Sequence, residues 1–379
     1  MAVIYDLTEE QTLLVNSVKE FLERECLESL VREVEWKQEG YSPDLWRKLG
    51  DVGFLGLGIP QEYGGGGGSF FELALFFEQA GRVLMPGPHL ATLGIGAQAL
   101  LHVGTEAQKQ HFLPRIASGD VRFALAVNER EGDHRPQHIR TSATPVGDRW
   151  VLNGQKYFIK DAFSCTHYLL AARTAPVSSP EYGVTLFIVP ADARGLSARP
   201  FRVLSGDMLA EVTLENVVVP QDNVLGRVHG GWFDLRPVLE KGKACLTLQM
   251  AGATDALMRK TVEYMKGRIT FGRPLATNQA LQHRMSQIAI QAYGALYQGY
   301  GAAWKLSQGI PASNEVSLAK IYASEAYRLC TNECLQFHGA YGFSVEFYVQ
   351  LYWRRMRLDE AILGDSFLEK EEVSLALGL

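Results

Sequence analysis

The feature that most constrains the fold of this chain is a double change in hydrophobic periodicity. Before about residue 120, apolar residues recur at the spacing of amphipathic helices, and Thr8 followed by Glu9, Glu10 and Gln11 predicts the N-cap of the first helix. Over 123–226 the pattern changes to short alternating segments rich in Val, Thr, Tyr and Phe, which is typical of strands. Examples are 149–154, 168–173 and 184–189. After Trp232 long amphipathic stretches return, and they predict helices over roughly 239–269, 278–307, 315–339 and 363–376. The order α, β, α therefore predicts an α+β fold with helices and strands in separate blocks.

The length of 379 residues exceeds one hydrophobic core, because single cores stop growing at about 250–300 residues. We expect three blocks, a helical N-terminal domain over 1–120, a small antiparallel β-barrel or sandwich over 121–230, and a C-terminal four-helix array over 231–379. Within the middle block, Asn153-Gly154 predicts a turn between two strands. The run Gly64–Gly68 predicts a loop between helices, since the Lys-Ser/Thr of a phosphate-binding loop does not follow it.

Composition excludes several classes of function. Lys and Arg number 37 against 42 Asp and Glu, so the net charge of −5 offers no basic field for nucleic acid or an anionic membrane. Five cysteines without a CxxC pair or metal-site spacing are typical of a reduced cytoplasmic chain. We expect no secretory signal, no membrane-spanning stretch and no metal site, and the sequence contains no GxSxG or HExxH motif.

Two segments of the C-terminal block carry groups that suit a nucleotide. Arg268–Leu275 is followed by Gln279, and Gln336–Gly342 comes later. A dinucleotide pyrophosphate binds guanidinium, amide and backbone N–H groups, and these segments supply them without a phosphate-binding loop. An ordinary helix–break–helix with a solvated Arg268 and Gln279 explains the first segment equally well, so both interpretations remain open.

Four further motifs, taken in order, give the chain a family resemblance. They lie at 57–65, 112–119, 152–159 and 217–226. Together with the two nucleotide segments they resemble the acyl-CoA dehydrogenase family over nearly the whole chain. The resemblance implies a helical N-terminal domain, a central antiparallel β-barrel domain and a C-terminal four-helix bundle. It also implies FAD held between the subunits of a homo- or hetero-oligomeric dimer or tetramer, an acyl-CoA substrate, electron-transfer flavoprotein as electron acceptor, and a place in fatty acid or lipid catabolism.

The resemblance also assigns cofactor contacts by matching position. Asn128 opens the segment in which the family has Thr-Glu-Pro-x-x-Gly-Ser-Asp, and its amide can bond a flavin edge. Phe158 and Lys160 fall where the family places an aromatic residue and a hydroxyl against the flavin ring, although plain strand core is the alternative for Phe158. The residues expected at the FAD of a neighbouring subunit are Arg268, Thr270, Phe271, Gln279, Gln336, Gly339 and Ala340.

The general base is where the chain departs from the family. Leu363 stands at the usual position of the catalytic Glu, and Gly242 stands at the position that some members use instead. Lys243 keeps a cation that the resemblance assigns to the CoA portion. Glu240 and then Asp365 are the candidate substitutes. A solvated or helix-capping carboxylate is the stronger interpretation of each, because Glu240 is rotated by about 200° from Gly242 on a helix.

Three functions follow from these observations. The first is an FAD-dependent acyl-CoA dehydrogenase that removes an α-proton and a β-hydride to give an enoyl-CoA. For this reaction the resemblance implies a flavin ribityl hydroxyl and the backbone N–H of Leu363 as donors to the thioester carbonyl. The second is a partner subunit of a hetero-oligomer that lacks the base and has a structural, FAD-sharing role. The third, a flavin oxidase or monooxygenase on the same fold, is disfavoured because no acid occupies the usual base position.

Overall fold

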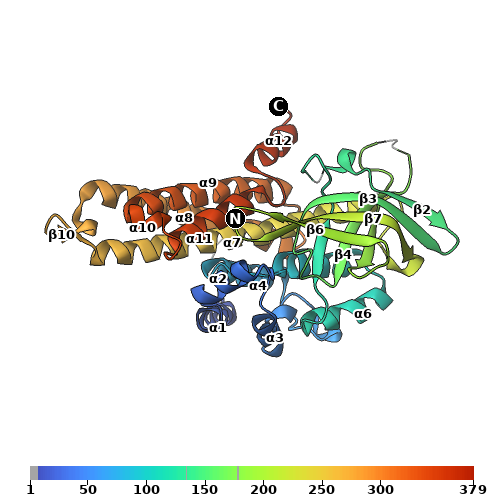
Figure 1. Cartoon of the computed structure of the whole chain (residues 1–379), viewed down its shortest axis with the longest axis horizontal. Helices are drawn as coiled ribbons and strands as arrows, with labels where there is room; N and C mark the ends of the chain where they lie inside the picture. Colours follow the sequence, from blue (N-terminus) through green and yellow to red (C-terminus); the bar gives the residue numbers. More distant parts are fainter. Residues whose placement is uncertain (1–6, 134, 177–178) are drawn as a thin grey trace. The chain divides into compact units, whose positions relative to one another are not determined.

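A computed structural model describes residues 7–133, 135–176 and 179–379 (Figure 1). By their internal contacts these residues form two compact units. The helical unit comprises the chain up to Arg32, Phe70–Met85 and Lys243–Leu379, and the sheet unit comprises Glu33–Ser69 and Pro86–Gly242. Both units cut across the three blocks expected from composition.

The helical unit is built on helices from the end of the chain. They are α7 (Gly231–Gly267, from Lys243), α8 (Gln279–Ser307), α9 (Ser313–His338), α10 (Ala340–Phe343), α11 (Val349–Ala361) and α12 (Ser366–Ala376). Helix α9 packs against α8, α11 and α12, as Figure 1 shows. A two-stranded hairpin, β9 (Ile269–Thr270) and β10 (Arg273–Pro274), joins α7 to α8. The periodicity predicted α7, α8, α9 and α12 but missed α10 and α11.

Earlier segments complete the helical unit. They are α1 (Glu9–Glu25), the start of α2 (Glu28–Lys37), and α4 (Phe70–Arg82). The predicted start of α1 is confirmed, because the Thr8 and Gln11 side chains form a reciprocal capping box. Helices α4 and α7 touch through glycine. A Cβ on Gly81 would lie 1.9 Å from the Gln249 carbonyl oxygen, so only glycine allows this approach.

The sheet unit contains short helices and one large sheet. The helices are α3 (Pro43–Asp51), a π-helix (Leu90–Gly96), α5 (Ala97–Val103) and α6 (Glu106–Ala117). The strands are β1 (Phe123–Ala126), β2 (Ser142–Val146), β3 (Arg149–Lys160), β4 (His167–Arg173), β5 (Val184–Pro190), β6 (Leu196–Arg202), β7 (Met208–Pro220) and β8 (Val224–Leu225). The predicted loop at Gly64–Gly68 is confirmed, because it follows the 3-10 turn Gln61–Tyr63 and precedes Phe70.

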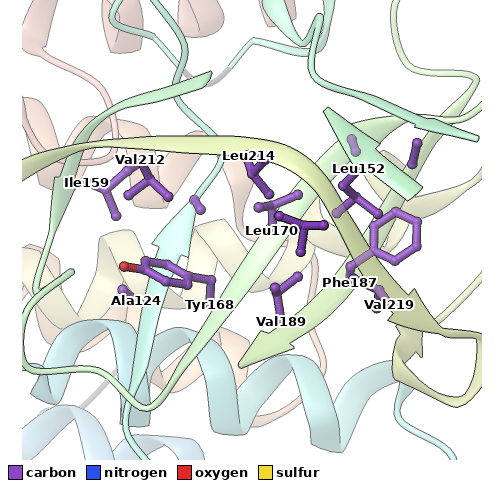
Figure 2. Close-up of a cluster of buried hydrophobic side chains, with 14 of the residues drawn as sticks. Ala124, Leu152, Ile159, Tyr168, Leu170, Phe187, Val189, Val212, Leu214 and Val219 are labelled. Atoms are coloured by element: carbon purple, nitrogen blue, oxygen red, sulfur yellow. The ribbon is translucent and has the colours of Figure 1, made fainter. Parts of the chain in front are cut away.

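The expected β domain is confirmed, with a correction to its closure. The strand order is β6-β7-β3-β2-β4-β5-β8, with β1 paired to β4, so the described strands form an open path rather than a closed barrel. The pairings β1·β4 and β2·β4 are parallel, and the others are antiparallel. The core lies on one face of this sheet, where Leu152, Leu170, Phe187 and Leu214 converge (Figure 2).

The predicted turn at Asn153-Gly154 is wrong. Both residues lie inside β3, at a register shift between β3 and β7. The glycine serves a close approach instead, because a Cβ on Gly154 would lie 2.7 Å from the Thr141 Cα. The Asn153 Oδ1 accepts the N–H of Asn216 at 2.8 Å and stabilises the irregularity. The hairpin turn of β2 and β3 lies at Gly147-Asp148, between the paired residues Val146 and Arg149.

Among the described residues, no helix has the length and apolar character needed to cross a bilayer.

Candidate functional site

In the sheet unit, Phe158 presents an aromatic ring to the surface. It lies at a second register shift between β3 and β7, with φ of +57°, a conformation that bulky residues rarely adopt. Its ring stacks on Phe201 at a centroid distance of 5.8 Å and is still 47% exposed. Gly132 lies beside the same ring, because a Cβ on Gly132 would lie 3.7 Å from the Phe158 Cε2. The bulge therefore displays an apolar face beside the 128–133 segment.

A buried ion pair fixes that segment to β3. The Lys156 Nζ lies 2.7 Å from the Glu129 Oε1 and also donates to the Val127 carbonyl oxygen at 3.2 Å. Glu129 accepts the backbone N–H groups of Arg140 and Thr141, each at 2.9 Å. The Tyr157 N–H donates to the Asn128 carbonyl at 3.0 Å. The structure thus brings Asn128 beside the strand that carries Phe158.

The two charges of this pair shift each other's titration. Burial raises the pKa of Glu129, but the Lys156 charge and the hydrogen bonds more than offset it, so the net pKa lies below its usual value. Burial lowers the pKa of Lys156, and the Glu129 charge opposes that shift. The Glu129–Lys156 pair is therefore a structural element that holds the 128–133 segment against β3.

Lys160 is held by acids of its own unit. Its Nζ lies 3.0 Å from the Asp161 Oδ1 and 3.7 Å from the Asp207 Oδ1. Where the resemblance expects a hydroxyl, the chain therefore has a charge-compensated ammonium.

In the helical unit, several predicted nucleotide contacts gather at one end. Arg268 follows α7, and its guanidinium carbon lies 5.9 Å from the Tyr341 ring centre. Gly339, between α9 and α10, and Ala340, the first residue of α10, immediately precede that tyrosine. Gly339 has φ of +58° and ψ of −135°, and nothing lies within 4 Å of where its Cβ would stand. This backbone is therefore open to close approach by a ligand.

The other predicted contacts of this unit are exposed. Phe271, at the tip of the β9–β10 hairpin, is fully exposed with φ of +53°. Gln279 begins α8 and Gln336 lies in the last turn of α9, and both side chains face solvent. Thr270 is half-buried in β9 and pairs with Arg273. Exposure of an apolar phenylalanine ring to water is unfavourable, so burial of the Phe271 ring against another molecule would lower the free energy.

The usual base position forms a buried turn between α11 and α12. Leu363 has φ of +60° and Gly364 has φ of +103°, and both residues are buried. Within the residues that the structure describes, neither backbone N–H of this pair donates a hydrogen bond. Buried N–H groups are almost always paired, so two adjacent unpaired donors indicate a missing acceptor.

Charged side chains surround this turn. The Asp365 Oδ1 accepts the N–H groups of Phe367 and Leu368, so this acid caps α12. Lys243 pairs with Glu369 at 2.6 Å, and only 16% of the lysine side chain is exposed. The Nζ of Lys320 donates to the Gly364 carbonyl oxygen at 2.9 Å. The Lys243 ammonium, which the resemblance assigned to CoA, is thus held inside the protein by Glu369.

Sequence reasoning missed Lys320 and Glu369. Lys320 carried a detectable signal, because it stands among Val316, Ala319 and Ala323 on the apolar face of α9. A lysine at such a position predicts an internal acceptor. Glu369 had no comparable signal, since its surroundings in α12 are mixed in polarity.

The remaining base candidates lie on α7, in the sheet unit. Glu240 is half-buried, and the next residue, Lys241, donates to the Gln98 side chain at 2.9 Å. Gly242 supplies no acid. Among the described residues there is also no group of three or more His, Cys, Asp or Glu side chains that could hold a metal ion.

Three family models match the chain in sequence order. They are the N-terminal domain of acyl-CoA dehydrogenase over 8–120, its middle domain over 124–217 and its C-terminal domain over 229–374.

Individual relatives match over nearly their full length. An acyl-CoA dehydrogenase of Bacillus subtilis is 27% identical, with 97% of this chain and 98% of the relative covered. The caffeyl-CoA reductase-Etf complex subunit CarC of Acetobacterium woodii is 28% identical, with 97% and 98% covered. The solved structure of butyryl-CoA dehydrogenase from Megasphaera elsdenii is 26% identical, covers both chains completely and superimposes with a TM-score of 0.92.

Proposed function

Because this chain belongs to the acyl-CoA dehydrogenase family, we propose that it oxidises an acyl-CoA thioester to the enoyl-CoA. The observation that carries the proposal is the pair of unpaired, buried backbone N–H groups at Leu363 and Gly364. A thioester carbonyl oxygen is the acceptor that such a pair suits. Donors at that oxygen stabilise the enolate that forms when the α-proton leaves, so they make the proton more acidic.

Members of this family bind FAD, and the residues present fit that cofactor. The exposed Phe158 ring offers an apolar face to a flavin, and Asn128 and Lys160 supply polar groups beside it. The open backbone at Gly339, next to the Arg268 guanidinium, suits a pyrophosphate. We propose that Ala340, Thr270, Phe271, Gln279 and Gln336 complete the contacts to a neighbouring subunit's FAD. When bound, FAD supplies the two-electron acceptor for the hydrogen on the β-carbon.

The chain's own residues then have separate tasks. The Leu363 and Gly364 N–H groups bind and polarise the carbonyl. Removing one such donor from an enzyme typically costs about 10²–10³ in kcat. For the α-proton we propose Glu240 as acceptor, because Asp365 is already engaged in capping α12. Lys243, paired with Glu369, is placed to support the turn more than to contact CoA.

A second candidate function is favoured by the absence of an acid at positions 363 and 242. In this alternative the chain is a partner subunit in a hetero-oligomer, where it shares FAD and the other chain carries the base. The relative CarC is named as a subunit of an Etf complex, which supports electron-transfer flavoprotein as the electron acceptor in either case.

Purification of the chain alone and with co-expressed candidate partners separates the two functions. The measurements are FAD per chain and acyl-CoA-dependent reduction of a dye or of electron-transfer flavoprotein, with acyl groups of graded length. Full FAD and turnover by the chain alone would exclude the partner-subunit function. FAD content that rises to one per site only with a partner would exclude the stand-alone enzyme.

The same assay tests the base. Glu240→Gln should abolish turnover and leave FAD content unchanged. The matched control is Glu263→Gln on the same helix, because that exposed glutamate pairs only with Lys266 among the ion pairs of the described residues. Equal turnover in both variants would remove Glu240 as the proton acceptor.

A further inference from the structure

Behind the Leu363–Gly364 turn lies a charged cluster that consists of Lys243, Lys320, Asp359 and Glu369. The four residues come from helices α7, α9, α11 and α12, and three of them are almost completely buried, while Lys243 retains slight exposure. Burial of so many charges is costly unless they are paired and hydrogen-bonded. The cluster therefore needs an explanation beyond packing.

Lys320 joins the turn to the end of α11. Its Nζ donates to the carbonyl oxygens of Gly364 at 2.9 Å, Glu360 at 3.1 Å and Asp359 at 3.4 Å. These three acceptors use all three hydrogen atoms of the ammonium group. The last carbonyls of a helix lack partners within the helix, so Lys320 completes the end of α11 and ties Gly364 to it.

Glu369 supports the turn from the other side. Its Oε1, which is paired with Lys243, lies where a Cβ on Gly364 would approach to 2.5 Å. Its backbone N–H donates to the Asp365 carbonyl at 3.0 Å. Lys320 thus holds Gly364 through a hydrogen bond to its carbonyl oxygen, and the Glu369 carboxylate packs against its Cα. Any larger residue at 364 would collide with the carboxylate.

The turn needs such support because its conformation is unfavourable by itself. A leucine with φ of +60° costs roughly 1–2 kcal/mol, and each buried N–H without an acceptor adds a desolvation cost. A free turn would relax so that Leu363 returns to negative φ and the N–H groups find acceptors. Contacts from α9 and α12 oppose that relaxation.

We propose that Lys320 is a positioning residue that, through the Gly364 carbonyl, holds the Leu363 and Gly364 N–H groups unpaired and aligned for a thioester oxygen, with the Glu369–Lys243 pair as its counterpart on α12. The role in thioester binding rests on the proposed function, whereas the mechanical role of Lys320 does not.

The electrostatic surroundings are consistent with this role. The pKa of Lys320 is lowered to about 8, because the effect of burial, with a contribution from the nearby Lys243, exceeds the opposing effect of Glu369, Asp359 and Asp365. Within the described part of the chain, the acceptors of its Nζ are three backbone carbonyl oxygens and no carboxylate, so these three bonds hold the ammonium in place.

The first test is amide hydrogen exchange over 358–369 in the FAD-loaded protein. Lys320→Met should speed exchange in this segment by about tenfold, since it removes charge-assisted bonds. Lys320→Arg should restore part of the protection. The matched control is Lys260→Met, because Lys260 is a lysine of the same unit whose ammonium lies over the Tyr348 and Tyr352 rings and does not contact the turn. Unchanged exchange in Lys320→Met would overturn the proposal whatever the ligand.

The second test compares CoA thioesters with CoA thioethers, which lack the carbonyl. Butyryl-, octanoyl- and palmitoyl-CoA are each titrated against the S-alkyl-CoA of equal length. The wild type should prefer the thioester by about tenfold, and Lys320→Met should lose that preference while FAD content and thioether affinity persist. Faster exchange with an intact preference would overturn the link to the carbonyl.

A wild type with no thioester preference would refute the proposed function of the turn, and the exchange result would still decide the mechanical role. If Lys320→Met does not fold, Gly364→Ala displaces the same turn from the side of Glu369. It should then give the same loss of thioester preference, and retention of the preference would overturn the proposal.

Discussion

Replacing Lys156 with methionine should destabilise the sheet unit by about 3–5 kcal/mol. The structure explains the size of this effect. The lysine side chain is completely buried and the Glu129 side chain is 8% exposed, so the substitution leaves a carboxylate without its cation in a dry site. It also removes the bond to the Val127 carbonyl. Two backbone N–H groups still donate to Glu129, and they place the expected loss toward 3 kcal/mol.

Denaturant unfolding measures this loss, followed by tryptophan and flavin fluorescence so that unfolding and FAD release are seen separately. The double variant Lys156→Met with Glu129→Gln should recover most of the stability, because no unpaired charge remains. Arg199→Met is the control in the same unit, since Arg199 is 73% exposed in its pair with Glu211 and should cost less than about 1 kcal/mol.

A loss below about 1 kcal/mol in Lys156→Met would refute the reasoning, because it would show that Glu129 tolerates burial without its partner. A double variant no more stable than the single one would refute it as well. In that case the lysine stem, and not the charge, would carry the stability.

Three further predictions concern single side chains. Phe158→Ala should change the free energy of unfolding by less than about 1 kcal/mol, because the ring is 47% exposed, yet it should reduce FAD retained after dialysis. Burial lowers the pKa of His167 to about 4, so the unfolded chain binds the proton first and the stability should fall as the pH drops from 6.5 toward 4. A plot of denaturation midpoint against pH should be flatter for His167→Gln than for the wild type, and identical plots for the two proteins would contradict this. Asp365→Ala should cost about 1 kcal/mol in thermal unfolding through loss of the cap, and abolished turnover in a folded variant would instead make Asp365 a catalytic candidate.

Much of the fold was predictable because it depends on local periodicity. The alternation over 149–154, 168–173 and 184–189 predicted strands that β3, β4 and β5 contain. Asn153-Gly154 misled because a dipeptide reports turn propensity, whereas the contact with Thr141 decided the conformation. Helix α11 was missed because charged residues interrupt its apolar pattern.

The site was predictable only where a motif carried it. The partners Glu129 and Lys156 are 27 residues apart, and nothing local announces their pairing. The conformation of Leu363 could not be predicted either, since leucine has no preference for positive φ and only Lys320 and Glu369 explain it. Nonlocal contacts set these features.

The most direct test of the central claim is anaerobic titration of the purified, FAD-loaded chain with acyl-CoA, read by the visible absorbance of the flavin. If the Leu363–Gly364 turn activates a thioester in an acyl-CoA dehydrogenase, at least one acyl-CoA of the length series should bleach the flavin stoichiometrically and yield enoyl-CoA. A fully loaded flavin that no acyl-CoA reduces, with the chain alone or with its partners, would contradict the account.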